Sequence, residues 1–240
     1  MALVFGEVAG LYDDVRPGYP EQLRRAIAER APDGRAVDIG AGTGKGTEVL
    51  LGLCDDVTAI EPDPRMAAVL RAKFPGVQIL ETTFEQWAPP AGGVALLACA
   101  MAWHWMDAGT RNRRAADALA PGGVLAVFGH RFGYADAAQS VAIGEVFDRA
   151  GRDVPMRPAH WIAEDVRGCG VWPSVEELEW HADLRLSTDG YLALTETFSP
   201  FRRHPPAMRR RVLDDLRAAI DGFGGTITLD LHTTLVLARR

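Results

Sequence analysis

The chain has 240 residues, of which 48% are hydrophobic and 24% are charged. This composition is typical of a globular protein, and the length suits one large domain or one domain with an appendage. The net charge of −6 disfavours nucleic-acid binding, which depends on clustered basic side chains. Three widely spaced cysteines, without metal-ligand spacing, favour a reducing cytoplasmic location and no metal. No apolar run is long enough to suggest a membrane segment, and no feature predicts an oligomeric state.

Short apolar runs alternate with longer amphipathic stretches up to about residue 130. Five of the runs predict strands, at Ala36–Ile39, Val57–Ile60, Val77–Leu80, Val94–Ala100 and Val124–Phe128. The stretches predict helices, at 20–30, 44–53, 63–74 and 107–120. Strand–helix alternation predicts an α/β fold, in which a parallel sheet carries helices on both faces.

The alternation changes after residue 130. Residues 134–150 predict a helix, and the glycine- and tryptophan-containing residues 151–173 predict an irregular cover. Two segments, Leu178–Leu184 and Gly225–Ala238, alternate as strands do, and a helix from Pro205 to Ile220 separates them. Two late strands divided by a helix would extend the sheet with one antiparallel member.

A glycine-rich loop follows the first predicted strand and opens a helix, with the sequence Val37-Asp38-Ile39-Gly40-Ala41-Gly42-Thr43-Gly44-Lys45-Gly46. Glycines let the backbone approach a ligand, and a helix N-terminus presents free N–H groups to it. The phosphate-binding loop needs Ser or Thr after Lys45, and the dinucleotide loop needs a glycine or alanine where Lys45 or Thr47 stands. What remains is Asp-x-Gly-x-Gly-x-Gly, the pattern of S-adenosylmethionine loops. The alternative is a tight turn with no ligand.

The second predicted strand ends in an acid, within Ala59-Ile60-Glu61-Pro62-Asp63. A carboxylate at this place can accept hydrogen bonds from both hydroxyls of a ribose, and it would repel a 2′-phosphate. Glu61 therefore agrees with a nucleoside-containing ligand.

Residues 35–128 resemble a class I S-adenosylmethionine-dependent methyltransferase. Four segments are more specifically similar to a bacterial small-molecule group near the trans-aconitate and ubiquinone-type methyltransferases: Tyr12–Pro20, Glu61–Met66, Phe84–Trp87 and Ala102–Asp107. The resemblance implies methyl transfer to a small organic metabolite by in-line SN2 displacement. It also implies a Rossmann-like, mostly parallel seven-stranded sheet with one late antiparallel strand.

The resemblance further implies a single methyltransferase domain over residues 1–240. Residues 1–34 would form an N-terminal cover and helix, and residues 35–130 the cofactor-binding core. Residues 131–173 and 188–222 would cover the substrate.

The resemblance assigns the cofactor contacts residue by residue. Asp38 would hold the amino group, Glu61 the ribose, and Pro62 would flank the adenine. Thr83 stands where many relatives have an acid that meets the adenine amine, and Met101 where close relatives often have Gln. The remaining contacts would come from the loop floor, one backbone N–H and the end of the fourth strand: Gly40, Ala41, Gly42, Gly44, Phe84 and Ala100.

His104 lies between two tryptophans just after the fourth predicted strand. Open α/β sheets bind ligands at this edge, and an unperturbed histidine titrates near neutrality. His104 is therefore a candidate catalytic base, or a donor to a substrate carboxylate. The alternative is that it orients the loop while the tryptophans pack.

Further residues are candidates for covering the cofactor and substrate. Tyr12, Arg16 and Tyr19 would supply aromatic cover and a cation, rather than only a staple onto the following helix. Arg202, beside Arg203, would bind an acidic group unless it lies on a solvated helix face. The remaining candidates are aromatic: Trp103, Trp161 and Phe198.

Three functions compete at this stage. The leading hypothesis is a methyltransferase for a small molecule, with neither a nucleic-acid nor a membrane partner. The alternative is a catalytically inactive cofactor-binding partner subunit with the same fold. A nicotinamide dehydrogenase is disfavoured by the glycine register and the late antiparallel strand.

Overall fold

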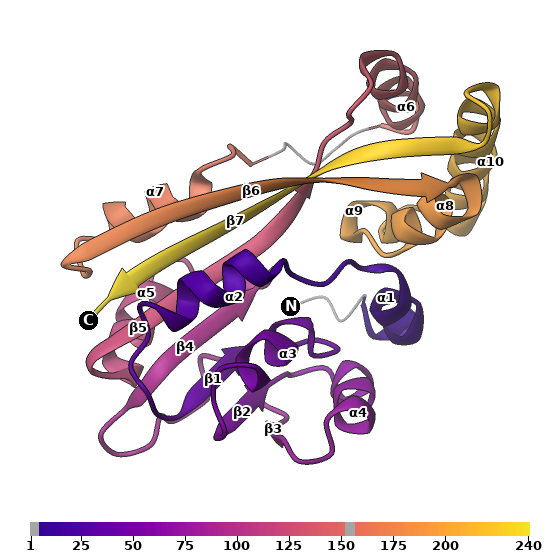
Figure 1. Cartoon of the computed structure of the whole chain (residues 1–240). Coiled ribbons are helices and arrows are strands. Elements are labelled where there is room, and N and C mark those ends of the chain that lie inside the picture. Colours follow the sequence, from indigo (N-terminus) through magenta and orange to yellow (C-terminus); the bar gives the residue numbers. More distant parts are fainter. Residues whose placement is uncertain (1–4, 152–156) are drawn as a thin grey trace.

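One twisted sheet organises the chain in the computed structural model, which describes residues 5–151 and 157–240. Its seven strands lie in the order β3-β2-β1-β4-β5-β7-β6 (Figure 1). Their bounds are β1 Ala36–Ile39, β2 Val57–Ile60, β3 Gln78–Leu80, β4 Val94–Ala100, β5 Leu119–Phe132, β6 Ser174–Ser187 and β7 Thr226–Arg239. β7 runs antiparallel to both its neighbours, and the pairs β1–β2, β1–β4, β2–β3 and β4–β5 are parallel. The predicted fold class is therefore confirmed.

The strand β5 differs most from its predicted bounds. It begins at Leu119, which pairs with Val94, and the pairing then shifts register before Val124 pairs with Leu96. The turn-like Pro121-Gly122-Gly123 therefore lies inside the strand as an irregularity instead of preceding it. Because the strand begins at Leu119, the helix predicted over 107–120 ends earlier, at Ala118.

Helices cover both faces of the sheet, as the alternation predicts. On one face α2 (Glu21–Ala28) and α3 (Lys45–Leu51) share a core with alternate strand residues, and α4 (Pro64–Lys73) packs against β2 through Leu70 and Ala59. On the other face lie α5 (Arg111–Ala118) and α7 (Trp161–Gly168). Two short 3₁₀ turns complete the helical elements described so far: η1 (Gly6–Val8) contacts α4, and η2 (Trp103–Trp105) precedes α5.

The strands β5, β6 and β7 are much longer than β1 to β3 and extend beyond them. A third core lies at this extension, formed by α6 (Ala137–Arg149), α8 (Thr188–Glu196), α9 (Ser199–Arg202) and α10 (Pro206–Gly222) with Ile227 and Leu229 of β7. Figure 1 shows α8, α9 and α10 at the end of β6, with α1 (Ala9–Val15) facing them from the side of α3 and α4. The carboxyl ends of the central strands therefore lie between α1 on one side and the helices α8, α9 and α10 on the other.

The segment 151–173 differs from its prediction as an irregular cover, and its residues 152–156 lie outside the described part of the chain. It contains the helix α7, whose Ala163 and Val166 are fully buried against the sheet. Asp165 fastens α7 to α5 by accepting hydrogen bonds from Arg111 and Asn112. Residues 161–172 thus cover a face of the sheet and not its carboxyl edge. No helix in the described ranges has the length and apolar character needed to cross a bilayer.

Candidate functional site

A cavity of about 610 Å³ lies at the carboxyl ends of β1, β2 and β4. Gly40 follows β1, Glu61 follows β2, and Met101 follows β4 on its wall. The chain leaves β1 toward β2 but leaves β4 toward β5, so the crevice between β1 and β4 is the switch point where such sheets bind ligands. The opposite wall comes from distant segments, with Tyr12 and Arg16 before the sheet and Phe198 beside α9.

The loop after β1 requires glycine for both conformation and space. Gly40 has φ 68°, in the left-handed region, and a Cβ atom there would lie 2.5 Å from Cβ of Ala102. A Cβ atom on Gly46 would lie 2.9 Å from both carboxylate oxygens of Asp38. The loop backbone at Gly40 and Gly42 therefore lines the cavity, and the lack of a side chain at Gly46 leaves room for the Asp38 carboxylate.

Asp38 is fully buried on β1. Its Oδ2 accepts a hydrogen bond of 2.8 Å from the Thr47 hydroxyl, whereas Oδ1 has no partner among the described residues. Burial raises the pKa of Asp38 to about 7, with a smaller contribution from Glu61. A buried carboxylate oxygen without a donor is a place for a cationic donor to bind.

Glu61 is the acidic side chain on the wall of the cavity at the end of β2. Its two oxygens accept backbone hydrogen bonds of 2.8 Å each, from Gly42 and from Asp63. Burial raises the pKa of Glu61, and these two hydrogen bonds oppose the rise. A carboxylate has about four acceptor positions, so each oxygen keeps one for a ligand hydroxyl.

The end of β3 supplies the next part of the wall. Thr83, Phe84 and Glu85 line the cavity together with Pro62. The Phe84 side chain is buried, and the Arg114 guanidinium donates to its carbonyl oxygen at 2.9 Å. These residues form a partly apolar end of the cavity.

Met101, after β4, and His130, near the end of β5, form a contact that the sequence did not predict. Met101 has φ 57°, which is strained for a side chain of this size, and its Sδ accepts the backbone N–H of His130 at 3.1 Å. His130 donates from Nε2 to the Gly18 carbonyl and accepts at Nδ1 from the Thr233 hydroxyl. Its position after the fifth predicted strand, at the ligand-binding edge, is a signal that could have identified it.

Arg16 lies on the cavity wall among aromatic rings. The centre of its guanidinium is 4.5 Å from the Phe198 ring, 5.0 Å from Tyr12 and 5.7 Å from Phe132. No carboxylate pairs with it in residues 5–151 and 157–240, and burial lowers its pKa. An unpaired, partly buried cation beside a cavity is suited to an anionic ligand.

His104 also lines the cavity, but the expectation that it titrates near neutrality is wrong. Burial, followed by the positive charges of Arg157 and Arg111, lowers its pKa to about 4. Its ring lies 4.6 Å from the Trp105 ring and 6.4 Å from the Trp161 ring. His104 is therefore a neutral imidazole at physiological pH.

Four other residues predicted as cover lie away from the large cavity. Trp103 is buried in the core and donates to Asp165. Trp161 lies beneath Arg111 and Arg157, and Tyr19 stacks on His130 beside a smaller adjoining cavity of about 40 Å³. Arg202 forms an ion pair with Glu7, so its charge is already compensated.

The arrangement fits the cofactor that the resemblance implies. The unpartnered Oδ1 of Asp38 suits an ammonium, and the remaining acceptor positions of Glu61 suit the hydroxyls of a ribose. The partly apolar end that Pro62 and Phe84 line suits a purine. These three chemistries follow one another along the edge of the sheet in the order β1, β2, β3, which is the order of the parts of S-adenosylmethionine.

Residues 36–123 match the protein family described as a methyltransferase domain. An uncharacterized methyltransferase of Mycobacterium tuberculosis (strain ATCC 25618 / H37Rv) is 38% identical over 125 residues, 52% of this chain and 51% of the relative. A trans-aconitate 2-methyltransferase of Sinorhizobium medicae (strain WSM419) is 33% identical over 119 residues, 48% of this chain and 46% of the relative. The chain thus spans about half the length of the curated relatives it matches.

Among solved structures, a protein of Anaeromyxobacter dehalogenans assigned as a type II methyltransferase is similar over 93% of this chain and 97% of its own. The TM-score is 0.67 at 23% identity, a likeness that shows the fold. The family match, the relatives and the shared fold thus agree that residues 36–123 form a methyltransferase domain.

Proposed function

We propose that the chain transfers the methyl group of S-adenosylmethionine to a small organic metabolite that carries a carboxylate. The observation that carries the proposal is the unpaired guanidinium of Arg16, on the wall of the same cavity that Asp38 and Glu61 identify as the cofactor site. A carboxylate on the acceptor would neutralise the charge of Arg16 and place the acceptor beside the cofactor.

The size and lining of the cavity support a small acceptor. Its volume of about 610 Å³ lies in the usual range for small-molecule sites, and it has to hold the cofactor as well. The wall near Arg16 is largely aromatic, with Tyr12, Phe132 and Phe198. With a net charge of −6, this lining favours a metabolite over a nucleic acid.

The similarity to a trans-aconitate 2-methyltransferase agrees with an organic acid as acceptor. The similarity covers about half of each chain, so it supports the class of acceptor and not the individual compound.

The cofactor supplies a methyl group activated on a sulfonium, and the residues of this chain position it and the acceptor. Asp38 would hold its amino group and Glu61 its ribose, and Arg16 would hold the acceptor carboxylate in line with the methyl group. Alignment of this kind can supply about 7–11 kcal/mol of the barrier to an SN2 displacement. Tyr12 and Phe198 would keep water away from the reacting atoms.

His104 would accept a hydrogen bond from the acceptor, or its proton where the methylated atom is a hydroxyl oxygen. Its low pKa keeps the acceptor position of the imidazole free at pH 7. The neutral ring also avoids a second positive charge close to the sulfonium.

The experiment is a methyl-transfer assay with the full chain, S-adenosylmethionine and a panel of small organic acids. Each acid is paired with its amide, which has the same size but no charge, and an RNA is included as a comparison. The expected result is formation of S-adenosylhomocysteine and a methylated product with an acid and not with its amide. Turnover of the RNA, or of the amides as well as the acids, would contradict the proposal.

A further inference from the structure

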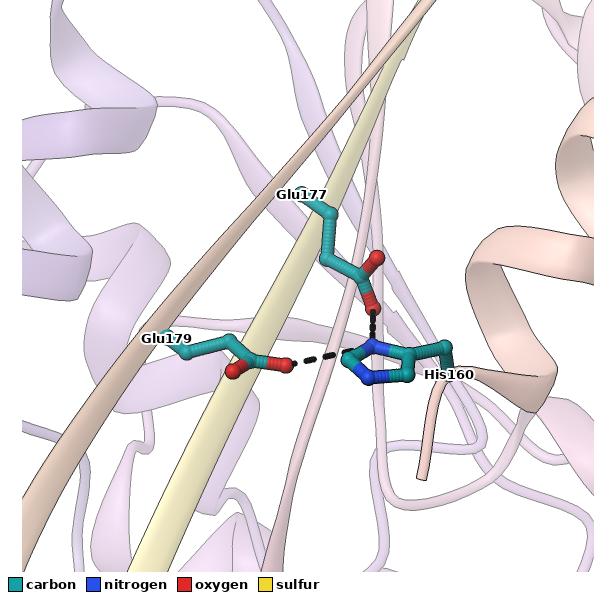
Figure 2. Close-up of side chains that lie close together, drawn as sticks. All are labelled: His160, Glu177 and Glu179. Carbon is teal, nitrogen blue, oxygen red and sulfur yellow. Dashed lines mark hydrogen bonds and ion pairs between the residues drawn. The ribbon is translucent and has the colours of Figure 1, made fainter. Parts of the chain in front are cut away.

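A second group of polar side chains lies on the outer part of the sheet, away from the cavity. Glu177 and Glu179 are two residues apart on β6, so both side chains point to the same face. His160, which immediately precedes α7, lies over that face (Figure 2). The three side chains converge from two elements that are separate in the sequence.

The donor atoms have the spacing of ligands around one small cation. Nδ1 of His160 lies 3.1 Å from Oε1 of Glu177 and 3.3 Å from Oε1 of Glu179. All three donor atoms lie within 4.8 Å of one another. Ligands ~2.0–2.1 Å from a zinc ion in a tetrahedral arrangement lie ~3.3 Å apart, which is close to the two separations measured from His160. Figure 2 shows the same nitrogen facing both carboxylates.

A second imidazole borders the group. Nε2 of His232, on β7, lies 3.4 Å from Oε2 of Glu179, whereas His160 faces Oε1 of the same carboxylate. This nitrogen is buried and makes no hydrogen bond with the described residues. Because β7 pairs with β6 and holds His232 next to Glu179, His232 could serve as a further ligand after a small rotation of the carboxylate.

The charges of the group also call for a cation. Two carboxylates on one face of one strand repel each other, and Arg167, 3.5 Å from Oε2 of Glu177, compensates only one of them. Glu177 is the more buried of the two, with its side chain 13% exposed. Its ionised form is therefore stabilised by any cation that binds between the two glutamates.

We propose that His160, Glu177 and Glu179 bind a Zn²⁺ ion, with His232 or water completing the coordination. The mixed nitrogen and oxygen donors suit zinc, whereas Mg²⁺ and Ca²⁺ prefer oxygen ligands alone. No sequence motif indicated this site, because its ligands lie 17 and 19 residues apart on two different elements. It is separate from the proposed methyl-transfer function and does not depend on it.

The ion would fasten the start of α7 to β6. The next residue after His160 is Trp161, whose ring contacts Arg157 and lies edge-on to His104. Fixing His160 therefore also fixes the support behind one wall of the cavity. The expected role is structural, because the ligands come from two separate elements and the ion would join them.

The test is isothermal titration of the full chain with Zn²⁺ after removal of bound metal by a chelator. The expected result is one ion per chain, and a rise in the melting temperature when the ion is added. His160→Ala and Glu179→Gln should each weaken binding at least tenfold and remove the thermal shift. His204→Ala, which removes an imidazole between α9 and α10, is the matched control and should bind as the unmodified chain does.

Glu179→Gln keeps the shape of the side chain, so it remains informative if His160→Ala does not fold. Co²⁺ is the spectroscopic probe, and it should give visible absorption that both site variants lose and the control keeps. Absence of Zn²⁺ binding would overturn the proposal, as would equal affinity in His160→Ala, Glu179→Gln and the control. Stronger binding of Mg²⁺ than Zn²⁺ would also overturn it.

Discussion

The guanidinium of Arg16 donates two hydrogen bonds to Thr197, from Nε to the hydroxyl at 2.8 Å and from Nη2 to the carbonyl oxygen at 3.0 Å. These contacts join the segment before the sheet to the end of α8, and Thr197 is fully buried. The same guanidinium borders the cavity among three aromatic rings. Arg16 is therefore held in place by one partner while its charge stays available to a ligand.

Replacement of Arg16 by methionine should raise the KM for an acidic acceptor by about 10- to 100-fold, because a hydrogen bond to a charged group contributes about 1.5–3 kcal/mol. Arg16→Lys should recover only part of this loss, since lysine cannot hold a carboxylate with two parallel bonds. The measurement is steady-state kinetics together with calorimetry of cofactor binding. Arg203→Met, on the exposed loop after α9, is the control.

The two readouts separate the possible anions. A raised KM with unchanged cofactor affinity places the acceptor carboxylate at Arg16. A loss confined to cofactor affinity means that Arg16 binds the carboxylate of the cofactor instead, which would contradict the acceptor role.

Glu61→Gln should weaken S-adenosylmethionine binding by about 10- to 100-fold, because the ribose hydroxyls lose a charged acceptor. The substitution keeps the shape of the side chain, although its amide nitrogen cannot accept one of the two backbone hydrogen bonds. Calorimetry measures the affinity, and thermal unfolding checks that the fold survives. Glu81→Gln removes an exposed carboxylate paired with Arg71 and should leave the affinity unchanged; equal affinities in all three proteins would exclude the ribose role.

Asp38 should make cofactor binding depend on pH. Its pKa in the folded chain is about 7, and the ionised form is the one that attracts an ammonium. Affinity should therefore rise from pH 5.5 to 7.5 in the unmodified chain and stay low and flat in Asp38→Asn.

The same group gives a check on stability in the absence of cofactor. Because burial raises the folded pKa of Asp38 above its unfolded value, the stability it contributes is present at low pH and is lost as the pH rises through about 7. Asparagine does not ionise, so the variant should gain stability relative to the unmodified chain as the pH rises from about 4 to about 7, and the difference should level off above pH 7. A pH-independent difference between the two proteins would contradict the raised pKa.

The cofactor half of the site could be read from the sequence because it depends on local order. The loop Gly40–Gly44 and the acid Glu61 follow strands that one apolar run each predicts, and β1 and β2 have the predicted bounds. Parallel pairing then brings their carboxyl ends together without further information.

The acceptor half depends on contacts between distant segments, which periodicity does not predict. Arg16 meets Thr197 only because β5, β6 and β7 continue beyond the other strands and carry α8 and α9 with them. Trp161 and Arg202 are residue types that suit a substrate cover. Trp161, however, lies on α7, which packs on a face of the sheet, and the charge of Arg202 is neutralised by Glu7. The low pKa of His104 likewise follows from its burial in the folded chain, and then from Arg157 and Arg111, which lie elsewhere in the sequence.

His130 should make the chain less stable in mild acid. Burial lowers its pKa to about 4, so between the unfolded value near 6.5 and about 4 only the unfolded chain binds the proton. Its contribution to stability is thus complete above pH 6.5 and is lost as the pH falls through that window, by about 1.4 kcal/mol per pH unit. His130→Gln keeps a donor for the Gly18 carbonyl and cannot be protonated.

Chemical denaturation of both proteins from pH 7.5 to pH 4.5 measures this effect. The difference in unfolding free energy should be largest at pH 7.5 and shrink as the pH falls. Using the difference removes the opposing contribution of Asp38, which both proteins share. A constant difference would mean that His130 titrates as it does in the unfolded chain.

His104 determines where the acid limb of the methyl-transfer rate lies. With a pKa of about 4, the imidazole is neutral throughout the neutral range, so at saturating cofactor kcat/KM for the acceptor should fall only below about pH 5 and show no limb near 6.5. If His104 takes the proton of the acceptor, His104→Asn should lower kcat by about 10²- to 10⁴-fold and abolish the limb, with unchanged cofactor affinity.

A variant of a neighbouring residue tests the cause of that low pKa. Arg157 is the larger of the two positive contributions that act on His104, after burial. Arg157→Gln removes the charge, and the acid limb should then move upward by a fraction of a pH unit, because burial, the largest cause, remains. Arg167→Gln, at the far end of α7, is the control and should leave the limb in place. A limb near 6.5 in the unmodified chain would show that His104 is solvated and not buried, and a limb that ignores Arg157 would assign it to another group.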